Sequence, residues 1–402
     1  MLITNVRPWG GEPCDIEIKD GVTVGVMPHD PARAATGDTV AGRGRLALPS
    51  LADVHCHLDS TRMGLPFRPH TGAPGVWGMM MNDRDHWRED EWSVAQRATY
   101  TLGRMIERGT TRVRSYAQID ADCGLERFEG VLAAKEAHAG RCEVEIMAFP
   151  QAGLLREKGV PALMDRALSS GAAVVGGIDP CTLDRDPVRH LDIVFDLAER
   201  HQAPVDIHLH EPGALGVFSV DLILERVRAL DMAGRVTLSH AYDLGSVSEA
   251  TTRRLIEEFA ELDIAMATVA PAQQRGLPLA ALTAAGVRVG LGEDGQRDFW
   301  SPYGNADMLD RTWQLAFTNG YRADELIEHC VAVASRGGAS ILQDGPPRLN
   351  SVADRPGLAA GDSADLLLVE GETVASAVMD RSADRTVLHR GRVVADGLNL
   401  VD

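Results

Sequence analysis

Two histidines, His55 and His57, stand two residues apart at the end of an apolar run, LALPSLADVHCHLD. Side chains along a strand alternate between its two faces, so both imidazoles would point to the same side. Histidine is the commonest metal ligand in proteins. The pair therefore fits either one metal ion or two unrelated histidines on a polar rim, and the rest of the chain must decide between these interpretations.

Titratable or amide side chains also end most of the other apolar runs. The runs that end AFPQAG, GGIDP, DIHLHEPG, SHAYD and GEDG contribute Gln151, Asp179, His208, His210, Glu211, His240, Glu293 and Asp294. Each of these endings has an ordinary structural explanation, but their recurrence predicts one shared metal site. Imidazoles and a carboxylate suit a divalent cation that keeps a position open for water. Such an ion lowers the pKa of its water for attack, and a neighbouring carboxylate can move the protons.

Eight strand-like runs, spread over residues 51–294, alternate with helix-like segments and would position these side chains. Asp186 and Pro187, for example, form an N-cap followed by a first-turn proline for a helix expected over 186–202. Eight such alternations predict an α/β fold, a (β/α)8 TIM barrel with its site at the carboxyl ends of the strands. A doubly wound open sheet is the alternative, but no GxGxxG follows an early strand to favour it.

Both ends of the chain read as short strands and turns. We therefore expect residues 1–48 and 346–402 to form a small composite β-sandwich domain, and residues 49–345 to form the metal-dependent barrel. Residues 62–92 interrupt the pattern as a long loop after the first barrel strand. The methionines and tryptophans of this loop would either cover an apolar ligand or pack against a second subunit.

Bulk composition excludes several kinds of partner. The 402 residues are 45% hydrophobic, and 58 acidic against 40 basic residues give a net charge of −18. This charge argues against binding to nucleic acid or to an anionic membrane surface. The six cysteines form no CxxC pair, and neither a signal peptide nor an apolar run of membrane-spanning length is visible. We expect a cytoplasmic protein with reduced thiols.

The set of HxH at the first strand, His at the fifth and sixth, and Asp at the eighth resembles the amidohydrolase superfamily. AFPQAG, VDIHLHEPG, RVTLSHAYD and RDFWSPYGNADML resemble its cytosine deaminase branch. VVGGIDP and RDFWSPYGN are closer still to the N-isopropylammelide amidohydrolases of that branch. The resemblance extends from about residue 40 to about residue 370, and its motifs are specific as a set.

The resemblance implies a role for each matching residue. The implied metal ligands are His55, His57, His208 and Asp294. The implied catalytic groups are Glu211 as general acid/base, His240 as the imidazole beside the metal-bound water, and Asp294. The implied substrate contacts are Gln151, whose amide would bind the substrate ring, and Trp300, which is otherwise a core tryptophan.

Two further residues are candidates for substrate binding, each with an alternative. His210 shares a strand face with His208, so it is either a substrate-binding or supporting group or a rim histidine that faces solvent. Asp179 either contacts the substrate or caps the loop before Pro180.

The chain departs from the resembling sequences at several positions. Tyr116 and Gln118 stand where relatives carry His and Asp, and Gly295 stands where cytosine deaminase has a second acid that would contact a ring nitrogen. Cytosine itself is therefore a weaker candidate substrate. Dinuclear relatives such as dihydroorotase carry a carbamylated lysine at the end of the fourth strand. This chain has no lysine there, so the resemblance favours one metal ion over two.

These patterns together predict a metal-dependent hydrolytic deaminase of a small N-heterocycle, such as an aminopyrimidine or an aminotriazine. Metal-activated hydroxide would attack the amino-bearing carbon and release ammonia or an amine. The alternative is a mononuclear amidohydrolase that cleaves a small cyclic or acyclic amide, and a third reading is a barrel that only binds ligand or assembles. We expect one divalent ion, zinc before iron or manganese, a small-molecule substrate and a homo-oligomer.

Overall fold

The computed structural model describes residues 1–402 except 33–37, 242–243, 273–275, 343–344, 346 and 402. Eight parallel strands form its central sheet, in the order of the chain. They are β6 (Leu51–Cys56), β7 (Thr110–Gln118), β8 (Glu143–Phe149), β9 (Val174–Ile178), β10 (Val205–Leu209), β11 (Val236–His240), β12 (Ala265–Thr268) and β13 (Val289–Leu291). All eight lie within residues 51–294, where eight strands are expected.

The sheet closes on itself at the candidate site. A parallel bridge joins Cys56, the end of β6, to Asp294, just beyond β13. The Asp294 amide donates a hydrogen bond to the His55 carbonyl at 2.8 Å. The first and last strands therefore meet where the metal ligands are predicted, and the barrel fold is confirmed.

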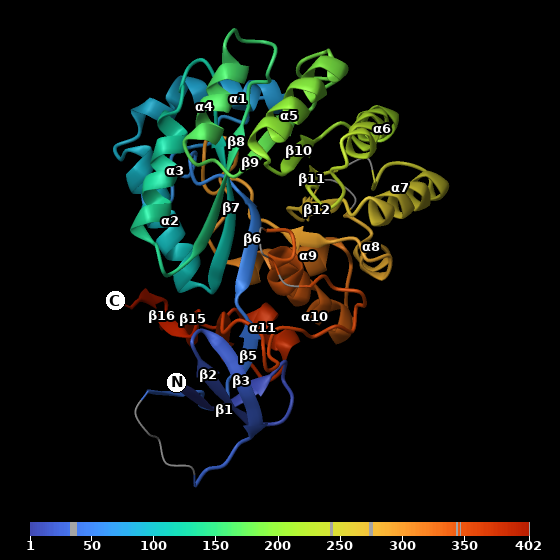
Figure 1. Cartoon of the computed structure of the whole chain (residues 1–402). Helices are drawn as coiled ribbons and strands as arrows, with labels where there is room; N and C mark the ends of the chain where they lie inside the picture. Colours follow the sequence, from blue (N-terminus) through green and yellow to red (C-terminus); the bar gives the residue numbers. More distant parts are fainter. Residues whose placement is uncertain (33–37, 242–243, 273–275, 343–344, 346, 402) are drawn as a thin grey trace.

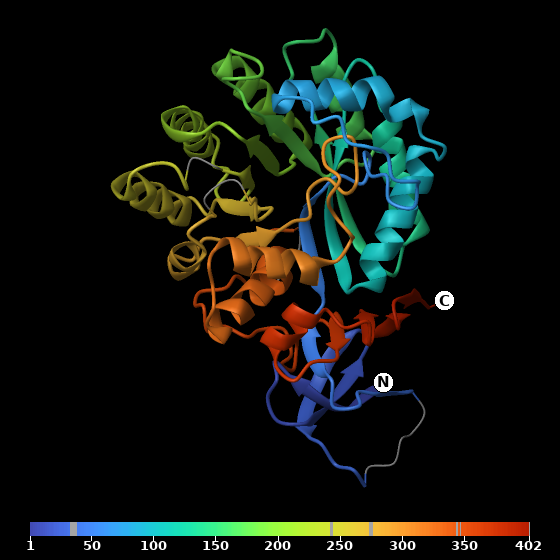
Figure 2. The ribbon, with the colours of Figure 1, turned by 180° about the vertical axis from the view of Figure 1, so that it is seen from behind.

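Helices surround the barrel on its outer side (Figures 1 and 2). They are α2 (Val94–Glu107), α3 (Glu126–Ala137), α4 (Val160–Ser169), α5 (Pro187–His201), α6 (Gly213–Ala229), α7 (Glu249–Glu261), α8 (Leu279–Ala284), α9 (Met308–Thr318), α10 (Asp324–Ala332) and the π-turn η2 (Val333–Gly337). As expected, Asp186 caps α5, accepting a hydrogen bond from the Arg189 amide at 3.2 Å. In the part of the chain that is described, no helix combines the length and the apolar character that a membrane span requires.

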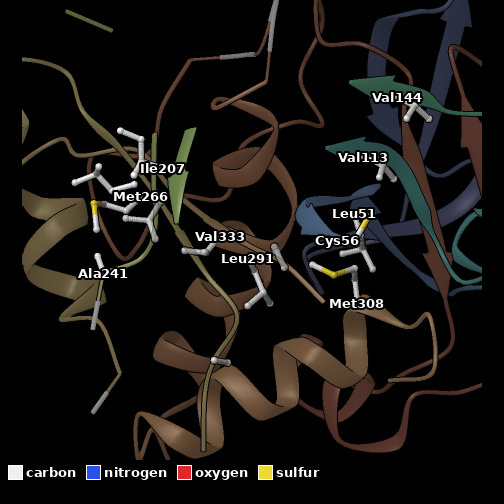
Figure 3. Close-up of a cluster of buried hydrophobic side chains, with 14 of the residues drawn as sticks. Leu51, Cys56, Val113, Val144, Ile207, Ala241, Met266, Leu291, Met308 and Val333 are labelled. Carbon is white, nitrogen blue, oxygen red and sulfur yellow. The ribbon is translucent and has the colours of Figure 1, made fainter. Parts of the chain in front are cut away.

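The layer between strands and helices is the main hydrophobic core (Figure 3). Its labelled members are Leu51, Cys56, Val113, Val144, Ile207, Ala241, Met266, Leu291, Met308 and Val333. Inside the barrel, apolar side chains such as Met147 and Val174 pack together, and a buried polar network lies beside them. Buried Asp206 of β10 accepts hydrogen bonds from Arg114 Nη1 at 3.0 Å, Tyr116 Oη at 2.9 Å and Ser239 Oγ at 2.7 Å. This satisfied network forms a fixed floor beneath the strand ends.

The two chain ends build a separate sheet, drawn in blue and red below the barrel in Figure 1. Its strands are β1 (Leu2–Pro8), β2 (Cys14–Lys19), β3 (Val22–Pro28), β4 (Thr39–Ala41), β5 (Leu46–Pro49), β14 (Leu366–Val369), β15 (Arg385–His389), β16 (Arg392–Asp396) and β17 (Asn399–Leu400), with α11 (Val374–Asp380) between β14 and β15. Strand β5 pairs antiparallel with β14, which joins the two ends. A separate β-domain from both ends is confirmed, and its limits of 1–48 and 346–402 stay a prediction.

The segment 62–92 is only partly the loop that its interruption of the strand–helix pattern predicts. Its second half forms α1 (Gly75–His86) and the short helix η1 (Trp87–Glu89). A buried ion pair holds the segment to α3, with Arg127 Nη2 2.5 Å from Asp83 Oδ2, and a second pair ties the segment to itself, with Arg62 Nε 2.7 Å from Asp90 Oδ1. These partners are distant in sequence, so local propensity does not reveal them.

Trp87 also has a different role from the two that the sequence suggests. It is buried within its own chain, and the Arg127 guanidinium lies 4.6 Å from its ring centroid. It therefore serves packing rather than a ligand or a second subunit.

Candidate active site

Three predicted site residues lie at or just beyond strand ends in left-handed backbone conformations. The φ angle is 34° at Asp179, 68° at His240 and 63° at Asp294. Residues other than glycine rarely adopt such angles, and they gather at functional sites. Ser239 points into the barrel toward Asp206, so strand alternation would turn His240 outward. The left-handed turn instead brings the His240 imidazole to the cavity wall.

Imidazoles from three strands meet around His55. The His55 ring centroid lies 4.5 Å from that of His208 and 4.6 Å from that of His240. Asp294 Oδ1 lies 3.6 Å from His55 Nε2 and 3.4 Å from His57 Nε2. Two groups of possible metal-ligand atoms result, His55 with His208 and His240, and His55 with His57 and Asp294, each within 4.8 Å. The predicted ligands and His240 are thus brought together at the strand ends.

The ring nitrogens of two of these histidines lack hydrogen bonds. Nδ1 and Nε2 are buried without a hydrogen-bond partner in both His55 and His208. Such unpaired buried groups are rare and costly. A metal ion would supply the missing partner, and three imidazoles with one carboxylate are a donor set that divalent cations accept. The residues present therefore fit a metal ion.

The electrostatics keep these groups in the forms that bind metal. Burial, together with the neighbouring histidines, holds the pKa of His208 and of His240 well below its usual value. Burial opposes ionisation of Asp294, but the adjacent imidazoles of His55 and His57 outweigh it and hold the pKa of that carboxyl well below its usual range. Neutral His208 and His240 and a charged Asp294 are the forms that metal coordination requires, whereas Asp294 overcomes burial and raises the pKa of His57.

A cavity of ≈ 650 Å³ opens above the cluster. Its wall includes the predicted substrate residues Gln151, His210 and Trp300. Farther along the wall, Trp313 and Phe317 of α9 stack with ring centroids 5.2 Å apart. The cavity thus combines a polar floor with an aromatic side, the usual composition of a small-molecule site.

Asp179 has a role that differs from both alternatives considered above. Its Oδ1 accepts a hydrogen bond from the His210 amide at 2.7 Å, and its Oδ2 accepts one from His210 Nδ1 at 2.7 Å. Of these two residues, His210 lines the cavity and Asp179 lies behind it. Asp179 therefore orients His210, which faces the cavity rather than open solvent.

Glu211, the predicted general acid/base, has its carboxylate held by donors outside the cavity wall. Its side chain is buried, and Oε1 accepts hydrogen bonds from the amides of Cys181 at 2.9 Å and Thr182 at 2.7 Å. Its Oε2 accepts a hydrogen bond from Ser219 Oγ at 2.5 Å. The carboxylate thus faces the segment after β9 and is not part of the cavity wall formed by the described residues.

Asp298 is a cavity residue that is not among the site residues predicted from sequence. Its Oδ1 accepts hydrogen bonds from the amides of Trp300 at 2.8 Å and Ser301 at 2.9 Å, so it positions the predicted Trp300. Burial, followed by the negative charge of Asp83, raises the pKa of Asp298 to about 7. The only signal in the sequence was its place in RDFWSPYGN, two residues before the tryptophan.

Comparisons with known proteins agree with this architecture. A profile of the amidohydrolase family matches residues 94–395. The protein YahJ of Escherichia coli K12 is 32% identical over 94% of this chain and 81% of its own length. The structure of N-isopropylammelide isopropylaminohydrolase from Burkholderia multivorans superposes with a TM-score of 0.92 at 36% identity, covering 100% of this chain and 99% of that one. The structure of 5-methylcytosine deaminase from Klebsiella pneumoniae gives 0.82 at 25% identity, covering 98% of both chains.

These findings confirm the resemblance drawn from the motifs. The family match spans well over half of the chain and includes the strands that end with His208, His240 and Asp294. Two of these relatives, those from Burkholderia multivorans and Klebsiella pneumoniae, are by name an aminohydrolase and a deaminase, which hydrolyse C–N bonds, and members of the superfamily are metal-dependent. The chain belongs to the amidohydrolase family and is a hydrolase of this kind.

Proposed function

We propose that the protein is a metal-dependent hydrolytic deaminase that removes an amino or substituted amino group from a small N-heterocycle. The carrying observation is the convergence of His55, His208, His240 and Asp294 beneath a cavity that also exposes an amide and aromatic rings. Relatives whose names specify a heterocycle, N-isopropylammelide and 5-methylcytosine, support this substrate class.

We assign the metal to His55, His57, His208 and Asp294, with zinc first and iron or manganese as alternatives. When bound, the ion would supply Lewis acidity and an activated water. A single ion is favoured because the Tyr116 ring lies 4.2 Å from the His55 ring and fills the space beneath it. Strand β9, in addition, ends without a lysine that could bridge two ions.

Proton transfer is assigned to the imidazoles in the cavity wall. His240 lies beside the ligand cluster and is placed to accept a proton from the attacking water. The His210 ring lies 4.4 Å from that of His240, and Asp179 fixes its orientation for proton delivery to the leaving amine. Glu211, the sequence-based candidate for this step, becomes a positioning residue for Cys181 and Thr182.

The substrate would lie between Gln151 and the aromatic wall. The Gln151 amide can both donate and accept a hydrogen bond at the ring edge. Trp300 offers an apolar face to a planar ring. A neutral heterocycle with polar edges matches these surroundings.

The test is an ammonia- and amine-release screen of zinc-loaded protein against aminopyrimidines, aminotriazines, pterins, isoguanine and creatinine. We expect release from at least one compound, metal near one ion per chain, and loss of both in Asp294→Asn. Ring opening or acyl cleavage without amine release would favour the alternative amidase. A metal-loaded protein that acts on none of the panel would overturn the proposal.

The proposal also includes a cellular location and an oligomeric state. All six cysteines are free thiols, which supports a cytoplasmic location. A homo-oligomer is proposed because large apolar side chains such as Phe67 and Tyr303 are exposed, at 68% and 76%. Light scattering on the purified enzyme tests the oligomer.

A further inference from the structure

Gly295 and Asp298 occupy the cavity wall as a pair. A Cβ atom built on Gly295 would lie 2.2 Å from Asp298 Oδ2 and 3.0 Å from its Cγ. Contacts that short do not occur between real atoms, so the Asp298 carboxylate fills the space that a side chain at position 295 would take. Both residues line the cavity, next to His57 and Ser60.

The two oxygens of Asp298 have different surroundings. Oδ1 is occupied by the amides of Trp300 and Ser301, which build the turn. Oδ2, the atom nearest to the missing side chain, accepts one hydrogen bond from Ser60 Oγ at 3.1 Å. A carboxylate oxygen has two lone pairs, so Oδ2 retains the capacity to accept another donor from the cavity.

We propose that Asp298 is a substrate-contacting residue whose Oδ2 accepts a hydrogen bond from an N–H group on the heterocycle, and that the absent side chain at position 295 makes this contact accessible. The inference rests on the proposed function and deepens it. The selected substrates are rings that present a lactam N–H or an exocyclic amino group to this wall, rather than rings that present only acceptor nitrogens there.

This geometry also changes one conclusion from the sequence. In the sequence alone, Gly295 removes an acid from the expected substrate wall, which counts against cytosine. The Asp298 carboxylate occupies that same space. Pyrimidines that present an N–H group to this wall are therefore candidate substrates again.

The central variant is Asp298→Asn, because its amide oxygen can still accept from Trp300 and Ser301 while its NH₂ group replaces Oδ2 and donates to Ser60. Gly295→Ala provides a second route, since its methyl group would displace the carboxylate without changing its charge. Asp354→Asn is the matched control: Asp354 accepts the amides of Asn350 and Ser351 in a turn remote from the cavity.

Each variant is compared with wild type on a compound that wild type deaminates and on the same compound methylated at the ring N–H. For Asp298→Asn we expect KM to rise about tenfold with kcat changed less than about threefold, as for loss of one hydrogen bond to the substrate. Methylation should raise KM in wild type but add little in Asp298→Asn. Gly295→Ala should show the same rise in KM and the same response to methylation as Asp298→Asn. Asp354→Asn should have the KM and kcat of wild type.

The outcomes separate this inference from the function beneath it. Wild-type turnover together with an unchanged KM in Asp298→Asn, or full additivity of variant and methylation, overturns the contact alone. Metal-loaded wild type that neither binds nor turns over any panel compound overturns the proposed function and the contact together.

Discussion

Asp179 holds His210 through two hydrogen bonds of 2.7 Å each, one from the backbone amide and one from Nδ1. A carboxylate can only accept, so it places the proton on Nδ1 and fixes both the tautomer and the orientation of the ring. His210 faces the cavity, and its ring lies 4.4 Å from that of His240. The two residues form a unit in which Asp179 acts through His210.

Replacing Asp179 with asparagine should separate orientation from charge. The amide oxygen can retain one of the two hydrogen bonds, but the NH₂ group would favour the opposite tautomer of His210. We expect kcat to fall about 10- to 100-fold with a smaller change in KM, as for other residues that orient a functional histidine. Steady-state kinetics on the compound found in the screen provides the measurement.

Asp186→Asn is the matched control for this variant. Asp186 lies seven residues along, is exposed and caps α5, and asparagine caps a helix equally well. Its kinetics should equal those of wild type. An unimpaired Asp179→Asn enzyme would show that His210 needs no partner for its role.

Glu211→Gln tests whether Glu211 positions a segment or transfers protons. Glutamine can keep the amides of Cys181 and Thr182 on its oxygen and can donate to Ser219, so the local structure should persist. We expect a loss in kcat of about tenfold or less. General acid/base catalysis contributes about 10²- to 10⁴-fold to the rate. A loss in kcat of that size would show that Glu211 transfers protons.

The companion variant Glu225→Gln makes the same change on α6, at an exposed position. It should leave kcat and KM unchanged. Circular dichroism of both variants would confirm that any difference arises in the site and not from unfolding.

The barrel and the order of its site residues could be predicted from sequence because both follow from local patterns. Buried parallel strands read as apolar runs, and the closed barrel brings all their carboxyl ends to one rim. His208 at the end of β10 and Asp294 beyond β13 are 86 positions apart in the sequence, yet this rule predicts that they meet. In the structure the His208 imidazole and the Asp294 carboxylate both lie next to His55.

The parts that sequence reasoning missed depend on distant partners or on backbone conformation. Asp83 fixes α1 through Arg127, 44 residues away, so the segment 62–92 reads locally as a loop. The rotamer of Glu211 is set by donors on two other segments. The relation of Asp298 to Gly295 requires knowing where a Cβ would fall. Periodicity contains none of this information.

Arg385 of the chain-end sheet stabilises the cavity wall. Its Nη1 and Nη2 each lie 2.9 Å from a different oxygen of Asp307, the residue that caps α9. Both side chains are buried, and α9 carries Trp313 and Phe317 of the cavity. Arg385→Met should lower the free energy of unfolding by about 3–5 kcal/mol, because it leaves a buried carboxylate without its partner. Urea unfolding of the zinc-loaded enzyme measures this.

The control is Arg200→Met, which removes an arginine of α5 from ion pairs on the surface. Exposed pairs contribute little, so this variant should unfold at the wild-type urea concentration. Equal destabilisation by the two variants would contradict the special role of Arg385.

Asp120 should make stability depend on pH in the acid range. Burial alone would raise its pKa, but the hydrogen bonds from Arg84, the Cys123 amide and Gln118 outweigh burial and lower the pKa to about 2. In the unfolded chain the carboxyl takes up its proton near 3.8, so the folded state gains stability that is complete above that pH. This contribution, roughly 2 kcal/mol, is lost as pH falls from about 4 toward 2.

Asp120→Asn isolates this contribution from the other carboxyl groups. The variant keeps an acceptor for the Cys123 amide but loses the charge that binds Arg84 of α1. We expect wild type to be more stable than Asp120→Asn at pH 6, and the difference in the free energy of unfolding to shrink steadily between pH 4 and pH 2.5. Denaturant titrations at fixed ionic strength on both proteins give this difference directly. If the difference in the free energy of unfolding stays constant between pH 4 and pH 2.5, the charge of Asp120 and its ion pair with Arg84 do not stabilise the fold.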